Sequence, residues 1–283
     1  MFCNEGARVA ILSISSQVAK GHVGNSATAF ALRRLGHEVW DVPTVVLSHH
    51  PGHGKPEGLA LPPGTLAAMV GSVTGRGRPA AVFSGYLADP ANGETVAQTV
   101  EALRADGPLP FLIDPILGDE ASGVYVRDGV EAVIRERLLP LADILLPNRF
   151  ELGLLAGGRI ATTDDALAAA RSLIARGPRA VICTSAPAEA GRVAVLAVTV
   201  EHAWRVEMAA VPDAPNGTGD LFSGVFMARW LEGMPLQEAA GHAAGAVHAV
   251  VAWSKAVGDE DLALVVAQAV LADPPALPQI EAV

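Results

Sequence analysis

The chain has 283 residues, of which 51% are hydrophobic and 18% are charged, and its formal net charge is −10. Such a chain has no excess of basic side chains to neutralise a phosphate backbone, so nucleic acid is not an expected partner. No apolar run reaches the about 20 residues that a membrane-spanning helix needs, and the first residues lack the pattern of a signal peptide. We therefore expect a globular cytoplasmic protein with no membrane partner.

Two cysteines, Cys3 and Cys183, are too few and too far apart to predict a disulfide framework or a zinc site. Each is interpreted as a buried or tail thiol, which indicates a reducing compartment.

Short β-branched runs alternate with longer Ala- and Leu-rich amphipathic segments, which is typical of βαβ units. The predicted strands are 8–14, 37–42, 79–85, 110–114, 142–147 and 179–185. The predicted helices are 24–35, 64–75, 91–105, 128–139, 149–156, 162–176, 218–232, 235–253 and 259–272. The pattern predicts an α/β protein with a mostly parallel sheet and helices on both faces.

Two later runs, "RVAVLAVTV" (192–200) and "HAWRVEMA" (202–209), are too close together for a crossover helix, so they predict an antiparallel edge. We expect one domain over residues 1–272. The Pro-rich end (273–283) is interpreted as a frayed tail.

Ligands in such sheets bind beyond the carboxyl ends of the strands, so polar residues that follow each strand are the first candidates for a site. These candidates are Ser16, Thr44, Gly85, Tyr86, Asp114, Asn148, Glu151 and Thr184, followed by "NGTGD" at 216–220.

The "NGTGD" segment places two glycines before a helix. Gly217 and Gly219 allow close backbone approach, and the N–H groups from Gly217 to Asp220 would face an anion at the helix start. An ordinary helix start is the alternative, since Asp220 would also complement the helix dipole.

Two further segments carry carboxylates. "FLIDPILGDEASGVYV" places Asp114 at a strand end, and "LLPNRFELGLL" places Asn148 and Glu151 three residues apart. Oxygen ligands at such points can hold Mg²⁺ through water against nucleotide phosphates. For Asn148 and Glu151 taken alone, the alternative is a capping box.

Together these segments resemble the ribokinase superfamily and, within it, the pyridoxal kinases. The resemblance covers nearly the whole chain, and its most specific parts are "GHVGNSA", "FSGYL", "IDPILGD", "ADILLPNRFEL" and "NGTGDLFSG". It implies a ribokinase-like three-layer sandwich that transfers phosphate from ATP to the 5′-hydroxyl of pyridoxal, and of pyridoxine or pyridoxamine, in vitamin B6 salvage.

The resemblance also implies the roles of individual residues. Asp220 would be the general base, while Gly217, Thr218 and Gly219 would stabilise charge on the transferred phosphoryl group. Asp114 and Glu151 would position Mg²⁺. The ATP contacts would be Asp114, Asn148, Glu151, Thr184 and Asn216, and the vitamer contacts would be Ser16, Thr44, His53, Tyr86 and Asp220. A homodimer and a role for K⁺ are further expectations of this kind.

The chain departs from the pyridoxal kinase pattern in its flap, which we define as residues 48–58. His53 stands where that family has a tyrosine, so we expect it to approach the pyridine ring; a solvent-facing histidine is the alternative. Lys20 replaces another tyrosine, and Thr184 stands where a lysine can contact the nucleotide. The three flap histidines are not expected to bind zinc, because no carboxylate pattern supports them.

Two other functions remain open at this point. One is a kinase of the same fold that acts on hydroxymethylpyrimidine or a sugar, which the flap and pocket residues would decide. The other is a vitamer-binding regulatory protein, which the presence of Asp220, Asp114 and Glu151 disfavours.

Overall fold

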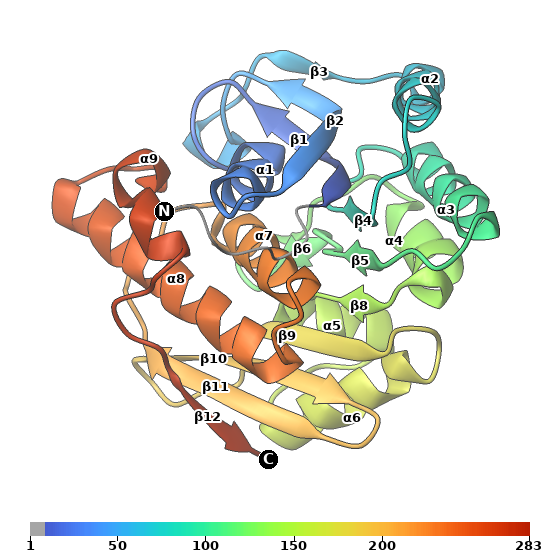
Figure 1. The fold of residues 1–283 in the computed structure, drawn as a ribbon. Coiled ribbons are helices and arrows are strands. Elements are labelled where there is room, and N and C mark those ends of the chain that lie inside the picture. The colour runs from blue at the N-terminus through green and yellow to red at the C-terminus, as the bar shows by residue number, and fades with distance from the viewer. Residues whose placement is uncertain (1–8) are drawn as a thin grey trace, which may run out of the picture.

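The computed structural model describes residues 9–283, and Cys3 and the first residue of the predicted strand 8–14 lie outside this range. The main sheet runs in the order β12-β11-β10-β9-β8-β5-β4-β1-β2-β3. Its strands are β1 (Ala10–Val18), β2 (Glu38–Leu47), β3 (Gly58–Ala60), β4 (Ala81–Ser84), β5 (Phe111–Ile113), β8 (Ile144–Leu145), β9 (Ala180–Ala186), β10 (Arg192–Thr199), β11 (Ala203–Ala209) and β12 (Gln279–Ala282). Figure 1 shows this sheet running through the molecule.

The strands from β2 through β1, β4, β5 and β8 to β9 are parallel, while β3, β10, β11 and β12 join the two edges in antiparallel pairs. The mostly parallel sheet and its antiparallel edge confirm the predicted fold class. Because parallel strands share one direction, their carboxyl ends meet at one side of the sheet. This geometry gathers residues that are far apart in the sequence.

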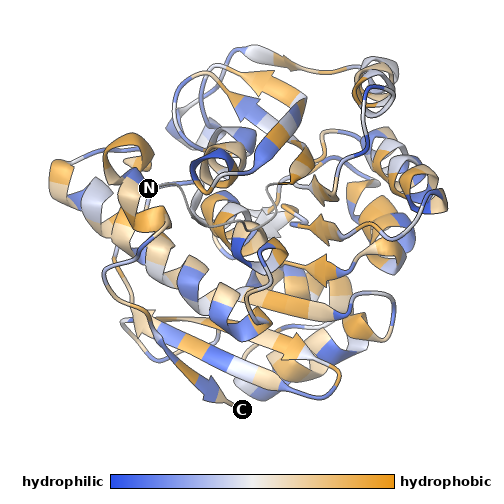
Figure 2. Cartoon of the chain, viewed as in Figure 1, coloured by the Kyte–Doolittle hydropathy of each residue, from blue (hydrophilic) through white to orange (hydrophobic). Residues whose placement is uncertain are grey.

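The helices form the two outer layers. They are α1 (Asn25–Arg34), α2 (Pro63–Thr74), α3 (Pro90–Ala105), α4 (Val130–Val133), α5 (Arg149–Ala156), α6 (Thr163–Ile174), α7 (Thr218–Leu231), α8 (Leu236–Val257) and α9 (Leu264–Ala267). One hydrophobic core lies between the sheet and α2 to α6, and a second lies between the sheet and α1, α7, α8 and α9. The central strands β4, β5 and β8 are mostly hydrophobic, as expected for strands covered on both faces (Figure 2).

Two predicted helices are wrong in their extent. Residues 259–272 contain only α9 and a 3₁₀ turn (Gln268–Leu271), because residues 259–263 form a loop anchored by buried Leu262. Residues 128–139 contain α4, then a π-helical turn (Ile134–Leu138) and a 3₁₀ turn with Pro140 (Leu139–Leu141). Pro140 has no backbone N–H to continue an α-helix.

The expectation of a frayed tail is wrong for its last residues. β12 pairs with β11, and Figure 1 shows it running along the outer edge of the sheet to the C-terminus. The side chain of Ile280 packs against the second core. An edge strand offers unpaired backbone groups, and the end of this chain pairs with them.

Besides β12, three short strands were not predicted. β3 extends the sheet beside β2, and β6 (Gly118–Asp119) pairs with β7 (Gly123–Val124) in a small separate hairpin. Cys183 is fully buried, as expected for one of the two thiols. Within residues 9–283, no helix is both long enough and apolar enough to span a bilayer.

Candidate active site

The glycine turn before α7 is tightly constrained at Gly217. Gly217 has φ +94°, and a Cβ at this position would lie 2.0 Å from the carbonyl oxygen of His22. By contrast, a Cβ on Gly219 would meet no atom within 4 Å in the described structure. The turn therefore packs against the loop of residues 19–24 on one side and faces open space at Gly219 on the other.

Asp220 follows this turn in the first turn of α7. Its Oδ1 is buried and has no hydrogen-bond partner among residues 9–283. Burial raises the pKa of the Asp220 carboxyl to about 6, and a hydrogen bond from the backbone N–H of Gly24 opposes that rise. A carboxylate with this affinity for a proton near neutral pH is suited to act as a base.

The position of Asp220 is fixed by the close packing of α7 against α1. Thr28 Oγ1 donates to the backbone carbonyl of Asp220 at 2.9 Å. A Cβ on Gly224 would lie 2.9 Å from the carbonyl oxygen of Thr28, so only glycine lets the two helices approach this closely here. The helix pair therefore holds the acid at a defined place.

Asp114 lies at the end of β5 and is only 7% exposed. Burial, together with the charges of Glu151 and Asp220, raises the pKa of Asp114 well above its usual value. Ser223 Oγ donates to Asp114 Oδ2 at 2.8 Å, and this hydrogen bond partly offsets the rise in pKa. The next loop includes Ile116 at φ +43°, a costly conformation for a β-branched residue and one found most often at functional sites. The structure thus brings Asp114 and Asp220 together.

Glu151 has the capping role that sequence analysis left open. Asn148 Oδ1 accepts from the Glu151 N–H at 3.0 Å, and Glu151 Oε2 accepts from the Asn148 N–H at 2.9 Å. Its other oxygen accepts from the N–H of Leu117 at 2.8 Å, which ties α5 to the loop after Asp114. Burial raises the pKa of Glu151 to about 7 despite these donors. Glu151 therefore shapes the acidic site as well as the helix start.

Tyr125 joins these carboxylates, although sequence analysis did not single it out. Its N–H donates to the carbonyl of Leu117 at 3.1 Å. Partial burial and the negative charges of Glu151 and Asp114 raise the pKa of its phenol, although 47% of the residue is exposed. The one signal in the sequence was its place near the end of the segment "FLIDPILGDEASGVYV", which contains Asp114.

The predicted vitamer contacts differ in whether their polar atoms are already hydrogen-bonded within the protein. Thr44 is fully buried and its hydroxyl donates to the carbonyl of Tyr86 at 2.8 Å. Burial raises the pKa of the Tyr86 phenol. The Ser16 hydroxyl makes no hydrogen bond within the described residues. It packs closely against Gly24, since a Cβ on Gly24 would lie 2.2 Å from Ser16 Oγ. Thr44 thus positions Tyr86, and the Ser16 hydroxyl remains available for a ligand.

The flap reaches the glycine turn at its tip. A Cβ on Gly52 would lie 2.8 Å from Asn216 Nδ2. His53 Nε2 lies 3.2 Å from Asp261 Oδ1, so its ring is engaged with a carboxylate. Lys20 also faces Asp261, at 3.7 Å, but is 74% exposed. The sequence analysis did not single out Asp261 as a site residue.

Thr184 lies within β9 beside α5. It forms an isolated bridge with Asn148, and its N–H donates to the carbonyl of Pro147 at 2.9 Å. Ser185, which follows it, has φ +50°. The predicted nucleotide contacts Asn148 and Thr184 are therefore neighbours.

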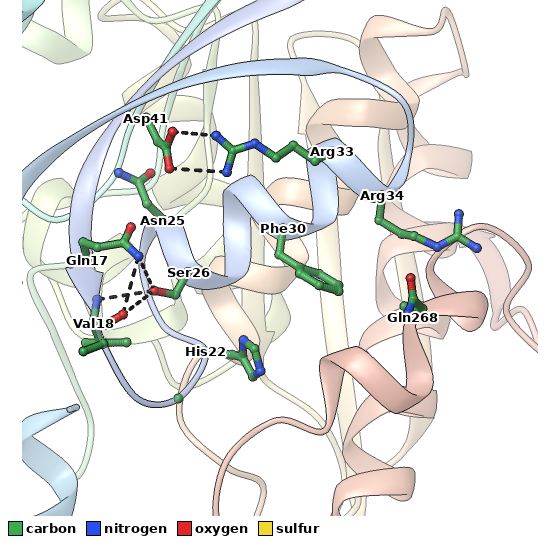
Figure 3. Close-up of a pocket in the computed structure, with 12 residues that line it drawn as sticks. Gln17, Val18, His22, Asn25, Ser26, Phe30, Arg33, Arg34, Asp41 and Gln268 are labelled. Carbon is green, nitrogen blue, oxygen red and sulfur yellow. Dashed lines mark hydrogen bonds and ion pairs between the residues drawn. The ribbon is translucent and has the colours of Figure 1, made fainter. Parts of the chain in front are cut away.

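A pocket of about 540 Å³ lies on the outer side of α1, apart from the predicted site residues (Figure 3). Gln17 Nε2 donates to Ser26 Oγ at 2.8 Å at one end of it, and Arg33 pairs with Asp41 at 2.6 Å at the other. His22 lines this pocket while its carbonyl faces Gly217. The 19–24 loop thus separates the pocket from the glycine turn.

Within residues 9–283, no group of three or more His, Cys, Asp or Glu side chains is arranged to hold a metal ion directly. The carboxylates of Asp114, Glu151 and Asp220 nevertheless lie close enough for the charges of Glu151 and Asp220 to raise the pKa of Asp114. Such a cluster favours a cation bound through water.

A sequence model described as "Phosphomethylpyrimidine kinase" matches residues 45–264. A protein named pyridoxal kinase PdxY from Rubrobacter xylanophilus is 41% identical over 280 residues, which are 96% of this chain and 97% of that protein. The chain belongs to the pyridoxal kinase family.

Solved structures support the fold of this pyridoxal kinase family member. Pyridoxal kinase from Entamoeba histolytica has a TM-score of 0.90 at 22% identity and covers 96% of this chain and 99% of its own. Pyridoxal kinase from Leishmania donovani in complex with ADP and pyridoxamine has a TM-score of 0.90 at 24% identity and covers 97% of this chain and 99% of its own. These similarities confirm the ribokinase-like fold.

Proposed function

We propose that the chain transfers the γ-phosphoryl group of ATP to the 5′-hydroxyl of pyridoxal, giving pyridoxal 5′-phosphate in vitamin B6 salvage. The observation that carries this proposal is Asp220, a carboxylate with a pKa of about 6 placed directly after a glycine turn with open space at Gly219. The names of the similar kinases support ATP and a B6 vitamer as the substrates.

In this proposal Asp220 takes the proton of the vitamer hydroxyl. Its unpaired Oδ1 can accept that proton, and the Gly24 N–H holds the carboxylate in place. The backbone N–H groups of Gly217, Thr218 and Gly219 stabilise charge on the transferred group, where positioning and electrostatics carry most of the catalysis.

The residues present fit Mg²⁺, because a cluster of buried carboxylates with raised pKa values favours a cation. Asp114 and Glu151 would hold it through water, since both Glu151 oxygens already accept backbone N–H groups. When bound, Mg²⁺ offsets the negative charge of the ATP phosphates.

The remaining contacts extend the same proposal. Asn148, Thr184 and Asn216 contact ATP, supported by the bridge between Asn148 and Thr184. Ser16 and Tyr86 contact the vitamer, while Thr44 holds Tyr86 through its carbonyl. His53 contributes through the flap.

Four broader expectations belong to the proposal. They are a single kinase domain over 1–272, a homodimer, a role for K⁺ and a cytoplasmic location. The homodimer is supported by the resemblance to pyridoxal kinases, and sedimentation at micromolar concentration tests it: a monomer there would contradict it.

A second candidate function is phosphorylation of hydroxymethylpyrimidine. The observation that favours it is the match of residues 45–264 to the phosphomethylpyrimidine kinase model. The 41% identity with a pyridoxal kinase over nearly the whole chain supports pyridoxal more strongly. A sugar kinase and a regulatory vitamer-binding protein have no comparable support.

The deciding experiment is a turnover assay with ATP and Mg²⁺ over pyridoxal, pyridoxine, pyridoxamine, hydroxymethylpyrimidine and ribose. The proposal expects pyridoxal to have the highest kcat/KM of the panel, with its 5′-phosphate as product. A higher kcat/KM for hydroxymethylpyrimidine would establish the second candidate, and binding of pyridoxal without turnover would indicate a regulatory protein.

A further inference from the structure

Asp261 joins three segments that are far apart in the sequence. Its carboxylate lies 3.2 Å from His53 Nε2 in the flap and 3.7 Å from Lys20 Nζ in the 19–24 loop. A Cβ on Gly21 would lie 2.7 Å from Asp261 Oδ1, so the carboxylate also rests against the backbone of that loop. Its side chain is only 17% exposed. The family motifs quoted above do not include this residue.

The segment that carries Asp261 is firmly anchored. Asp261 donates its N–H to Asp259 Oδ1 at 3.1 Å, and the next residue, Leu262, is 1% exposed. The N–H of Ala263 donates to the buried hydroxyl of Ser254 at 2.8 Å, which ties the segment to α8. Asp261 is therefore a fixed point against which a mobile segment can close.

The flap itself has few attachments. Residues 49–57 form hydrogen bonds with one another and with Ser48. Among the described residues, the contact of His53 with Asp261 is the only ion pair or hydrogen bond that joins them to any other part of the chain. Most side chains of these residues are exposed. The tip nevertheless lies on the glycine turn, because Gly52 packs against Asn216. Its closed position thus depends heavily on one polar contact.

We propose that Asp261 is a positioning residue: it holds His53, and through His53 it holds the flap closed over the "NGTGD" turn. The inference rests on the proposed kinase function. Closure of the flap excludes water that competes with the alcohol for the phosphoryl group. A partly exposed pair contributes little energy, so the flap can also open to exchange ligands.

The charged groups around the contact between Asp261 and His53, which we call the latch, are consistent with this role. Lys20 faces the second oxygen of Asp261, and the ring of His50 lies 6.5 Å from that of His53. Burial and the neighbouring His53 lower the pKa of His50, while the charge of Asp261 opposes that shift. The only flap side chain within ion-pair distance of Asp261 among the described residues is that of His53. Asp261 therefore has His53 as its flap partner.

Hydrogen exchange in the protein without substrates tests the latch independently of the kinase activity. Asp261→Ala should speed the exchange of amides in residues 49–57 by about two- to five-fold, the effect of losing one partly exposed polar contact. Glu260→Ala is the matched control, since it removes the same charge from the adjacent exposed residue, whose side chain makes no described contact. Equal exchange in wild type and Asp261→Ala would overturn the proposal.

A double-mutant cycle tests the consequence for the reaction. His53→Ala and Asp261→Ala should each raise KM for pyridoxal and the ratio of ADP to pyridoxal 5′-phosphate by about two- to five-fold, with less change in KM for ATP. The double variant should add little, because both changes break one contact. Additive effects, or an unchanged product ratio, would refute the role of Asp261. Failure of the wild type to phosphorylate pyridoxal would refute the proposed function, and the exchange experiment would still decide the latch.

Discussion

Asp220 depends on two neighbours for its chemistry: Gly24, whose N–H keeps the carboxylate in place, and Thr28, which holds its carbonyl. We predict that Asp220→Asn keeps the fold and ATP binding but lowers kcat by at least about 10²-fold, the usual effect of losing a general base. Asparagine matches aspartate in shape, so the helix packing remains. Measuring kcat and the Kd for ATP checks this, and near-normal turnover in a folded variant would remove Asp220 from the base role.

Glu151 combines two roles that one substitution can separate. Glu151→Gln removes a charge next to Asp114 and keeps an acceptor oxygen for only one of the two N–H groups, those of Asn148 and Leu117, that donate to the carboxylate. We predict that the Mg²⁺ concentration needed for half-maximal activity rises more than KM for pyridoxal. A Mg²⁺ titration on both proteins provides the measurement, and an unchanged titration would leave Glu151 with its capping role alone.

At the scale of the element, the start of α7 offers a matched pair of substitutions. Gly217→Ala forces a residue with a side chain into a left-handed backbone conformation, which costs about 1–3 kcal/mol. The added Cβ would also clash with the His22 carbonyl oxygen. Gly219→Ala meets no atom of the described protein. We predict a lower Tm and lower activity for Gly217→Ala, but an unchanged Tm with lower kcat/KM for Gly219→Ala. Thermal unfolding and steady-state kinetics measure both, and full activity of Gly219→Ala would mean that no ligand approaches this turn.

The elements also show which parts of the fold a sequence can predict. The predicted helix 149–156 matches α5 residue for residue, because Asn148 and Glu151 are only three residues apart in the sequence and mark its start by a local capping box. The end of the chain was misjudged because β12 forms only by pairing with β11, which is about 70 residues away. Local pattern cannot report such a partner.

The same distinction holds for the site. Asp114, Glu151 and Asp220 lie in recognisable motifs, and the sheet brings them together at the carboxyl ends of its parallel strands, where ligand sites are expected. Tyr125 had only a weak local signal, and Asp261 had none, because its importance arises from contacts with His53 and Lys20 at distant positions. Residues that act through tertiary contacts therefore required the structure.

At the scale of the whole molecule, the acidic site makes stability depend on pH. The pKa of Glu151 rises from 4.5 to about 7 on folding. The folded protein thus binds this proton more tightly than the unfolded chain, so the contribution of Glu151 is fully present below pH 4.5 and is lost as the pH rises through about 7. His37 and His242 act in the opposite direction, because burial lowers their pKa values and penalises folding at acid pH.

A comparison with Glu151→Gln isolates the carboxylate from these histidines, which both proteins share. We predict that, without Mg²⁺, the Tm of Glu151→Gln minus that of the wild type increases between pH 4.5 and 7. The reason is that ionisation of buried Glu151 destabilises the folded wild type over this range, whereas the variant has no such group. Adding Mg²⁺ at pH 8 should raise the Tm of the wild type more than that of the variant, because a cation stabilises the ionised cluster. Thermal unfolding at several pH values, with and without Mg²⁺, measures both effects. A difference in Tm that stays constant with pH would show that Glu151 ionises as easily in the folded protein as in the unfolded chain.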